Sequence, residues 1–354
     1  MTVVPPSSDP LPSLPAQPEG VPFPTVEWPE GPAPDAIADR LHARVHQVFD
    51  PETLDTAAER MGQSLAFVAV HRGRIVAEAY GPTAGPDEQL ISWSMAKSIT
   101  HALTGVLVGE DRLRLDAPIG FDEWSDPEDP RSSITLDHLL RMVPGTEFNE
   151  DYVDAQTSHC IEMLFGDGKT DMGAYTAALP SIAPADTVFN YSSGTTVLVC
   201  RALAEQVGGG DDFAAWAEQV LFRPIGMQPR LTFDEVGTWV GSSFLHATAR
   251  DFARFGLLYA RDGVWDGARL VPEGWVDYAR TPRAANEEGT RYGAQWWIWP
   301  PTDGVFYAAG YETQRIIVDP VSDLVLVRLG KTPTELAEHV DAWLEGIRLL
   351  FRNG

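Results

Sequence analysis

Residues 65–80 of the chain read LAFVAVHRGRIVAEAY, two apolar runs separated by Arg72-Gly73. Short apolar runs rich in β-branched residues, joined by a turn that contains glycine, are typical of a β-hairpin. We therefore predict strands over Leu65–His71 and Arg74–Tyr80. Three further runs near the other end of the chain predict strands of the same kind, at Gly304–Ala309, Gln314–Val318 and Leu324–Leu329.

Helical patterns surround these strands. Apolar residues recur at helical spacing just after Asp35 and again from about Thr334 to Phe351, which predicts a helix at each end of the globular chain. Segments with a helical pattern also fill the middle of the chain, at Met95–Val108, Leu136–Met142, Thr195–Gln206, Phe213–Leu221 and Ala249–Asp262. The fold class we predict is α/β plus all-α. An antiparallel β-sheet built from residues 35–90 and 291–354, and flanked by the terminal helices, would carry a mainly helical inserted domain, 91–290.

The first 34 residues differ from the rest in composition. They contain 11 of the chain's 28 prolines, and proline fixes φ and removes an amide donor. This stretch can therefore be neither a helix nor a central strand. We predict an extended or disordered N-terminal arm, 1–34, which if ordered would lie across the body through Val21, Phe23, Val26 and Trp28.

The charge balance excludes some functions. The chain has 26 basic and 51 acidic side chains, a net charge of 26 − 51 = −25, and only three of the basic residues are lysines. Nucleic acids and anionic membrane surfaces are recognised by clustered Lys and Arg, so neither is an expected partner. Two cysteines allow no disulfide framework, and no Cys/His spacing suggests a metal site. With no secretory signal visible, we expect a cytoplasmic protein.

Ser94 and Lys97 are the first candidate catalytic residues. They lie three residues apart where a helical pattern begins, so both side chains project from one face. A serine hydroxyl becomes a nucleophile when a base takes its proton, and a buried lysine can be that base. One of the three lysines stands here, beside the apolar Trp93 and Met95. By itself, a Ser-x-x-Lys spacing also fits a helix start on the surface.

Two more segments could complete such a site. Tyr191, within Phe189–Gly194, precedes the helical pattern at Thr195, and its phenolate could accept the serine proton if a nearby lysine lowered its pKa. The segment Ala309–Gln314 leads into a predicted strand, whose edge could supply a backbone N–H to an oxyanion. Taken alone, each segment fits equally well with an ordinary packed loop.

Together and in this order, the three segments resemble the motifs of the serine β-lactamase/penicillin-recognising superfamily, in its class C-like branch. Ser94-x-x-Lys97 resembles the first motif, Tyr191-x-Ser193 the second, and Tyr311-Glu312-Thr313 falls at the third. The resemblance covers about residues 35–350. It implies the same sheet with a helical insert, and a serine hydrolase without metal or organic cofactor.

Local sequence is most similar to the 6-aminohexanoate-dimer (nylon-oligomer) hydrolases of that superfamily. The matching pieces are Trp93–Ser98, Glu150-Asp151-Tyr152, Tyr191–Gly194 and His246–Gly256. The resemblance implies that Tyr152 closes over the substrate and hydrogen-bonds its amide; an exposed loop aromatic is the alternative. The residues that the resemblance places around the substrate are Tyr152, Ser193, Tyr311, Glu312 and Gln314.

The third motif departs from the usual pattern of that superfamily. It lacks both the basic residue that binds a substrate carboxylate and the glycine that admits substrate, and Tyr311 and Glu312 would partly fill the space. Ser193 also replaces the amide side chain of the commoner Tyr-x-Asn. These differences argue against efficient β-lactam hydrolysis.

The function we expect is hydrolysis of a small-molecule amide or ester through an acyl-enzyme. Ser94 would be the nucleophile, Lys97 and Tyr191 the proton-transfer pair, and the backbone amides of Ser94 and of the strand near Gln314 the oxyanion hole. A carboxylesterase, β-lactamase or D-amino-acid peptidase of the same fold is the alternative, and a non-catalytic binding or scaffold homologue is the alternative from another class. A homodimer is compatible with the sequence.

Overall fold

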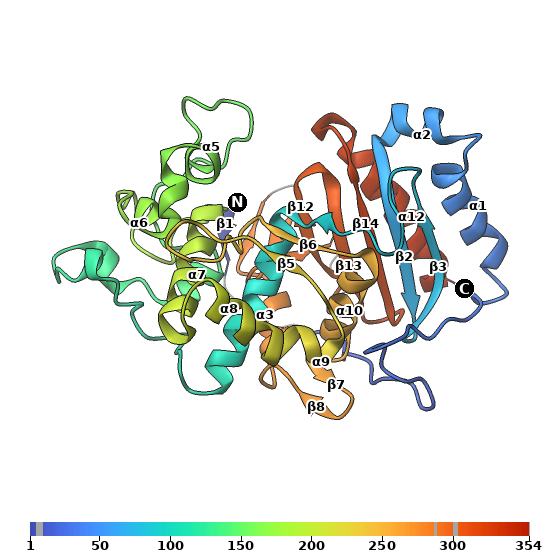
Figure 1. Cartoon of the computed structure of the whole chain (residues 1–354), viewed down its shortest axis with the longest axis horizontal. Helices are drawn as coiled ribbons and strands as arrows, with labels where there is room; N and C mark the ends of the chain where they lie inside the picture. The colour runs from blue at the N-terminus through green and yellow to red at the C-terminus, as the bar shows by residue number, and fades with distance from the viewer. Residues whose placement is uncertain (5–9, 287–288, 300–303, 354) are drawn as a thin grey trace.

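The computed structural model describes residues 1–4, 10–286, 289–299 and 304–353. Its main element is a nine-stranded sheet in the order β1-β9-β10-β11-β12-β13-β14-β2-β3, in which neighbouring strands run antiparallel. Figure 1 shows this sheet with α1, α2 and α12 at one end of the molecule and most of the other helices at the opposite end. The predicted fold class is confirmed.

The strands predicted from both ends of the chain lie next to one another in the sheet. They form β2 (Gln63–His71), β3 (Arg74–Tyr80), β12 (Phe306–Gly310), β13 (Gln314–Asp319) and β14 (Leu324–Lys331). β14 pairs with β2, with Val327 opposite Val68, so strands from the two ends of the chain are neighbours in the sheet. The sheet is completed by β1 (Thr2–Val3), β9 (Ala284–Ala285), β10 (Arg291–Tyr292) and β11 (Trp297–Ile298).

Alternate side chains of the central strands serve two hydrophobic cores. Phe67 and Ala69 pack with the apolar faces of α1 (Ala38–Phe49) and α12 (Ala337–Asn353). Ala66, Val68 and Val70 point to the opposite face, where α10 (Ala249–Ala260) and α3 (Ala96–Gly109) contribute to a larger core. α10, which lies within the predicted helical insert, thus helps to cover the sheet itself. Both faces of the sheet are buried.

The remaining elements are α7 (Ser193–Val207), of 15 residues, and several shorter helices and strands. The shorter helices are α2 (Leu54–Met61), α4 (Leu136–Leu140), α5 (His159–Phe165), α6 (Met172–Ala177), α8 (Asp211–Ala217), α9 (Arg223–Ile225) and α11 (Trp275–Arg280). A small sheet combines β4 (Leu90–Ile91), β6 (Leu245–Ala247) and β5 (Arg230–Leu231), and β7 (Val264–Trp265) pairs with β8 (Ala268–Arg269). No helix within the described residues is long and apolar enough to cross a membrane.

The described part of the N-terminal arm is extended and bound to the body. Buried arginine side chains donate to its carbonyls, from Arg254 to Pro24 at 2.7 Å and from Arg280 to Pro12 at 2.6 Å. Trp28 is buried in the larger core, and Phe23 packs on Trp265, whereas the predicted anchor Val26 is 85% exposed. Proline-rich chain leaves carbonyls without helical or sheet partners, and these arginines supply the missing donors. Residues 5–9 of the arm lie outside the described residues.

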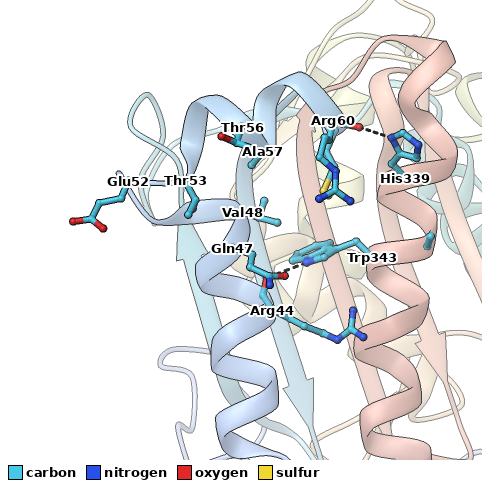
Figure 2. A pocket seen from close by; sticks show the side chains of 12 residues that line it. Arg44, Gln47, Val48, Glu52, Thr53, Thr56, Ala57, Arg60, His339 and Trp343 are labelled. Carbon is cyan, nitrogen blue, oxygen red and sulfur yellow. Dashed lines mark hydrogen bonds between the residues drawn. The ribbon is translucent and has the colours of Figure 1, made fainter.

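A groove of about 470 Å³ lies between α1, α2 and α12. Figure 2 shows Arg44 and Arg60 reaching into it, with Trp343 and His339 on the facing helix. The Trp343 indole donates to the Arg44 carbonyl at 3.0 Å, and the His339 ring lies 2.7 Å from the Arg60 carbonyl. These contacts attach α12 to both neighbouring helices. No predicted site residue lines this groove.

A buried ion pair joins α12 to the turn after β13. Arg348 donates to Asp319 at 2.8 Å, and both side chains are at most 2% exposed. Asp319 also accepts the backbone N–H of Val321 and Ser322 in the turn. Arg348 also donates to Glu345, through two hydrogen bonds of 2.8 Å. Truncating Asp319 therefore leaves Arg348 one carboxylate partner, but it removes a buried acceptor from both the guanidinium and the turn.

We therefore predict that Asp319→Ala lowers the free energy of unfolding by about 2–3 kcal/mol, because a buried arginine and two N–H groups of the turn lose an acceptor. The exposed pair of Arg114 and Asp116, with side chains 71% and 74% exposed, provides the matched control. Asp116→Ala should cost less than about 1 kcal/mol. Urea denaturation followed by circular dichroism measures both values, and equal losses for the two variants would contradict the prediction.

Candidate active site

Ser94 lies in a single tight turn, Trp93–Met95, that leads directly into α3. Trp93 has a φ of +43°, a conformation that is rare for a bulky residue and is often found beside functional residues. Hydrogen bonds from the preceding Ser92 stabilise it: its N–H donates to the Leu245 carbonyl at 2.8 Å, and its hydroxyl donates to the Trp93 carbonyl at 2.9 Å. The small sheet thus fixes the turn that presents Ser94.

Lys97 connects Ser94 to two other parts of the chain. Its Nζ lies 3.1 Å from the Ser94 hydroxyl, 3.0 Å from the Ser193 hydroxyl and 2.9 Å from the Ser242 carbonyl. The lysine is 2% exposed. One turn of helix places the amine beside the nucleophile, as the i, i+3 spacing predicted, and the other two acceptors come from α7 and from the loop before β6.

Burial lowers the pKa of the Lys97 amine, and the negative charge of Glu150 opposes that shift. A lysine with a depressed pKa is more readily neutral, and the neutral amine has the lone pair that can take the Ser94 proton. The geometry and the direction of this pKa shift therefore support the same role for Lys97.

Tyr191 is the third candidate catalytic residue, and its ring lies beside the Lys97 amine. The Lys97 amine is 5.0 Å from the centre of its ring, which also packs against Trp297 and Tyr292 at 5.2 and 5.9 Å. Burial, reinforced by the charge of Glu150, holds the pKa of Tyr191 above its usual range, although hydrogen bonding with Ser94 acts in the opposite direction. A resting phenolate, which the sequence had suggested as the base, is therefore disfavoured. A neutral phenol suits transfer of a proton to a leaving group.

Ser193 and Glu150 extend the polar site beyond the lysine. The Ser193 hydroxyl donates to one Glu150 carboxylate oxygen at 2.5 Å, and the Ser193 N–H donates to the other at 2.7 Å. Ser193 is the first residue of α7, whose N-terminus favours a carboxylate. Sequence reasoning gave Glu150 no role. Glu150 and Ser193 are 43 residues apart in the sequence, so no local sequence pattern predicts their contact.

The third motif forms a tight turn between β12 and β13. Glu312 and Thr313 have φ values of +58° and +64°, and both carbonyls accept from the buried Arg328 at 3.0 and 3.1 Å. Burial lowers the pKa of Arg328 to about 9. The Glu312 carboxylate accepts from the Trp93 indole at 3.3 Å. The turn is thus attached both to the sheet below it and to the segment that presents Ser94.

The turn's other side chains have different surroundings. Tyr311 is 42% exposed and contacts Trp93 edge-to-face at 5.7 Å. The Gln314 side chain is buried and bonded to Gly330, donating to its carbonyl at 2.6 Å and accepting its N–H at 2.9 Å. Gln314 can therefore contribute only its backbone N–H to the site, because its side chain is bonded to Gly330. Gly310 allows β12 to approach closely, because a Cβ there would lie 2.3 Å from the Ser92 carbonyl.

An apolar cavity of about 110 Å³ opens beside Ser94. Its lining residues are Trp93, Ser94, Tyr152, Cys160, Ile161, Leu164, Phe165, Ser193, Ser243 and Tyr311. Tyr152 lies over it, with its ring 5.3 Å from that of Tyr311 and its hydroxyl donating to Glu150 at 2.9 Å. Apart from serine hydroxyls, two phenols and the Trp93 indole, the lining side chains are hydrocarbon and sulfur.

The structure thus gathers Ser94, Lys97, Tyr191, Ser193 and Tyr152 around one point. Tyr311 also lines the cavity, whereas Glu312 contacts the lining residue Trp93 through its indole N–H. Among the tryptophans near residue 297, Trp297 contacts Tyr191, whereas Trp296 and Trp299 are buried in the two cores. These placements agree with a nucleophile, a base and a proton donor at the mouth of an apolar cavity.

Known proteins share both the sequence pattern and the fold. Residues 54–349 match the family model described as Beta-lactamase. The 6-aminohexanoate-dimer hydrolase of Paenarthrobacter ureafaciens is 24% identical over 316 residues, which cover 80% of this chain and 76% of that protein.

Two solved structures illustrate the similarity in fold. A candidate 6-aminohexanoate-dimer hydrolase from Bacillus anthracis superposes with a TM-score of 0.71 at 24% identity, covering 84% of this chain and 80% of that one. A class C beta-lactamase from Rhodobacter sphaeroides gives a TM-score of 0.63 at 15% identity, covering 88% and 99%. Since the family model spans most of the chain, the chain belongs to the beta-lactamase family, whose members are typically serine hydrolases.

Proposed function

We propose that this protein is a serine hydrolase that cleaves an amide or ester bond through an acyl-enzyme on Ser94. The observation that carries the proposal is the 3.1 Å contact between the Ser94 hydroxyl and the buried Lys97 amine. A serine in hydrogen-bond contact with a base of depressed pKa is the arrangement that nucleophilic catalysis requires. The relative from Paenarthrobacter ureafaciens, named as a hydrolase of an amide dimer, supports the amide side of the proposal.

The proton path follows from the contacts. Neutral Lys97 takes the Ser94 proton as the serine oxygen bonds to the substrate carbonyl, and the backbone N–H of Ser94, with one from the turn before Gln314, faces the developing oxyanion. The Tyr191 hydroxyl then gives its proton to the leaving amine or alcohol and recovers one from the Lys97 ammonium. Water then attacks the acyl-enzyme. Its proton passes to Tyr191 as the Tyr191 hydroxyl gives one to Lys97, and the Lys97 ammonium returns a proton to the departing Ser94 oxygen.

The cavity favours an uncharged acyl group. Its lining includes Ile161, Leu164 and Phe165 from α5, and no lysine or arginine is found among the lining residues that the structure describes. The carboxylates of Glu150 and Glu312 contact two of the lining residues, Ser193 and Trp93. A carboxylate entering this space would lose its hydration without gaining a cationic partner. This chemistry disfavours the β-lactamase and D-amino-acid peptidase alternatives, whose substrates present a carboxylate, and favours an ester or amide of an apolar acid.

The nucleophile is tested by Ser94→Ala. We expect that variant to lose labelling by a fluorophosphonate probe and to lose turnover by at least about 10⁴-fold, because no other group can form the acyl-enzyme. Ser98→Ala is the matched control, since Ser98 lies one turn further along α3 and donates to the Gln295 carbonyl at 2.7 Å, away from the reacting atoms. Labelling that persists in Ser94→Ala would overturn the mechanism, because another residue would then be the nucleophile. An unmodified protein that takes up no label would favour a binding or scaffold role.

The base is tested by Lys97→Arg and Lys97→Met. Arginine keeps the positive charge but does not deprotonate, and methionine keeps an apolar stem. We expect either change to slow Ser94 labelling by at least about 100-fold. In the unmodified protein, labelling should fall as the pH drops through the pKa of Lys97, which lies below the ordinary lysine range. A Lys97→Arg protein that labels at the original rate would show that another group is the base.

The acyl preference is tested with two esters that share one leaving group. p-Nitrophenyl butyrate and mono-p-nitrophenyl succinate have acyl chains of equal carbon number, and only the second ends in a carboxylate. We expect kcat/KM to be roughly 100-fold higher for the butyrate, because an unpaired charge is costly to desolvate. Nitrocefin and D-alanyl peptides should be poor substrates, and the 6-aminohexanoate dimer tests the amide alternative directly. Equal rates on the two esters would contradict an apolar acyl site.

A further inference from the structure

The polar network behind Lys97 ends on a carboxylate to which neither the motifs nor the relatives give a function. Starting at the nucleophile, hydrogen bonds run from Ser94 to Lys97 at 3.1 Å, from Lys97 to Ser193 at 3.0 Å, and from Ser193 to Glu150 at 2.5 Å. A hydroxyl has a single proton. Because Ser193 gives that proton to Glu150, its lone pair remains to accept from Lys97.

We propose that Glu150 is a positioning residue that acts through Ser193 to orient Lys97 and to set its proton affinity. This inference rests on the proposed function, in which Lys97 is the base. Glu150 does not touch the reacting atoms; only the single hydroxyl of Ser193 separates its carboxylate from the amine. It helps to fix the hydroxyl proton of Ser193, and its negative charge favours the ammonium form of the lysine.

The position of Glu150 is itself well determined. One carboxylate oxygen accepts the Ser193 N–H at 2.7 Å at the start of α7, and the other accepts the Ser193 and Tyr152 hydroxyls at 2.5 and 2.9 Å. Three donors from two chain segments orient the group. They leave the carboxylate facing Ser193 rather than the substrate cavity, whose lining does not include Glu150.

The charge of Glu150 balances two requirements of the reaction. The resting lysine must be neutral, and burial provides this by lowering its pKa. After the proton moves from Ser94, an ammonium group is buried in the same place and needs a counter-charge. Glu150 supplies that charge, and Ser193 hydrogen-bonds both groups, so the ammonium formed during acylation is stabilised. Without it, Lys97 would be neutral over a wider pH range but would accept the serine proton less readily.

The test is the pH dependence of Ser94 phosphonylation, which needs no knowledge of the substrate. In Glu150→Gln the shape of the side chain is retained and its charge is lost. The other titratable groups that face Lys97 are Tyr191, Cys160 and Cys200, and burial raises the pKa of each, so they stay neutral while the lysine titrates. We expect the acidic limb of the rate profile to move to lower pH by about one unit, because removing a nearby negative charge lowers the pKa of an amine. We also expect the plateau rate to fall by about 10-fold to 100-fold.

Two further variants separate this effect from a structural one. Glu147→Gln makes the same charge change on an exposed side chain of the same loop and should leave the limb in place. Ser193→Ala, which cuts the connection, should lower the plateau rate as Glu150→Gln does.

An unchanged limb in Glu150→Gln would overturn the inference while leaving the proposed function standing. A limb that moves equally in Glu147→Gln would overturn it too, because the effect would then belong to net charge. Failure of the unmodified protein to label at Ser94 would instead refute the proposed function. Thermal unfolding of each variant shows whether a lower plateau reflects lost structure.

Discussion

The burial of the Lys97 amine is the constraint on which the site depends. An amine that is removed from water must find hydrogen-bond acceptors inside the protein, and Lys97 finds three of them, in Ser94, Ser193 and the Ser242 carbonyl. These come from the start of α3, the start of α7 and the loop before β6, and Ser193 and Ser242 lie 96 and 145 residues after Lys97 in the chain. The helical part must therefore pack in one arrangement to satisfy this single group, and that arrangement is the one that aligns the nucleophile with its base.

The same reasoning explains why the second motif can end in serine. A serine at position 193 has one hydroxyl, which can donate once, whereas an amide side chain can donate and accept through separate atoms. For Ser193 to accept from Lys97, its proton needs another partner, and the Glu150 carboxylate is that partner. Glu150 also accepts the first N–H of α7, so one residue completes both a helix terminus and the polar network. The substitution of serine for asparagine and the presence of Glu150 are thus parts of one arrangement.

How much could be predicted from the sequence depended on the range of the contacts. The hairpin at 65–80, the strands near the C-terminus and the final helix follow from periodicity, and the Ser94–Lys97 contact follows from one turn of helix. Ser193 and Glu150 are 43 residues apart in the sequence. Arg328 donates to the carbonyls of Thr313 and Glu312, which lie 15 and 16 residues before it. Neither set of contacts has a periodic signature. The protonation of Tyr191 was also beyond the sequence, because it depends on burial between Trp297, Tyr292 and Lys97 rather than on neighbours in the chain.

The placement of charge connects the chain's acidity to the proposed choice of substrate. Of the three lysines, one is enclosed in the site, and most arginines near the sheet are committed to carboxylates or to backbone carbonyls, as Arg328 and Arg254 are. The described residues that line the cavity beside Ser94 include no basic side chain. The net charge of −25 also gives the whole molecule an electrostatic field that repels anions from the cavity beside Ser94. Local desolvation and long-range repulsion therefore act in the same direction, and both select an acyl group that carries no negative charge.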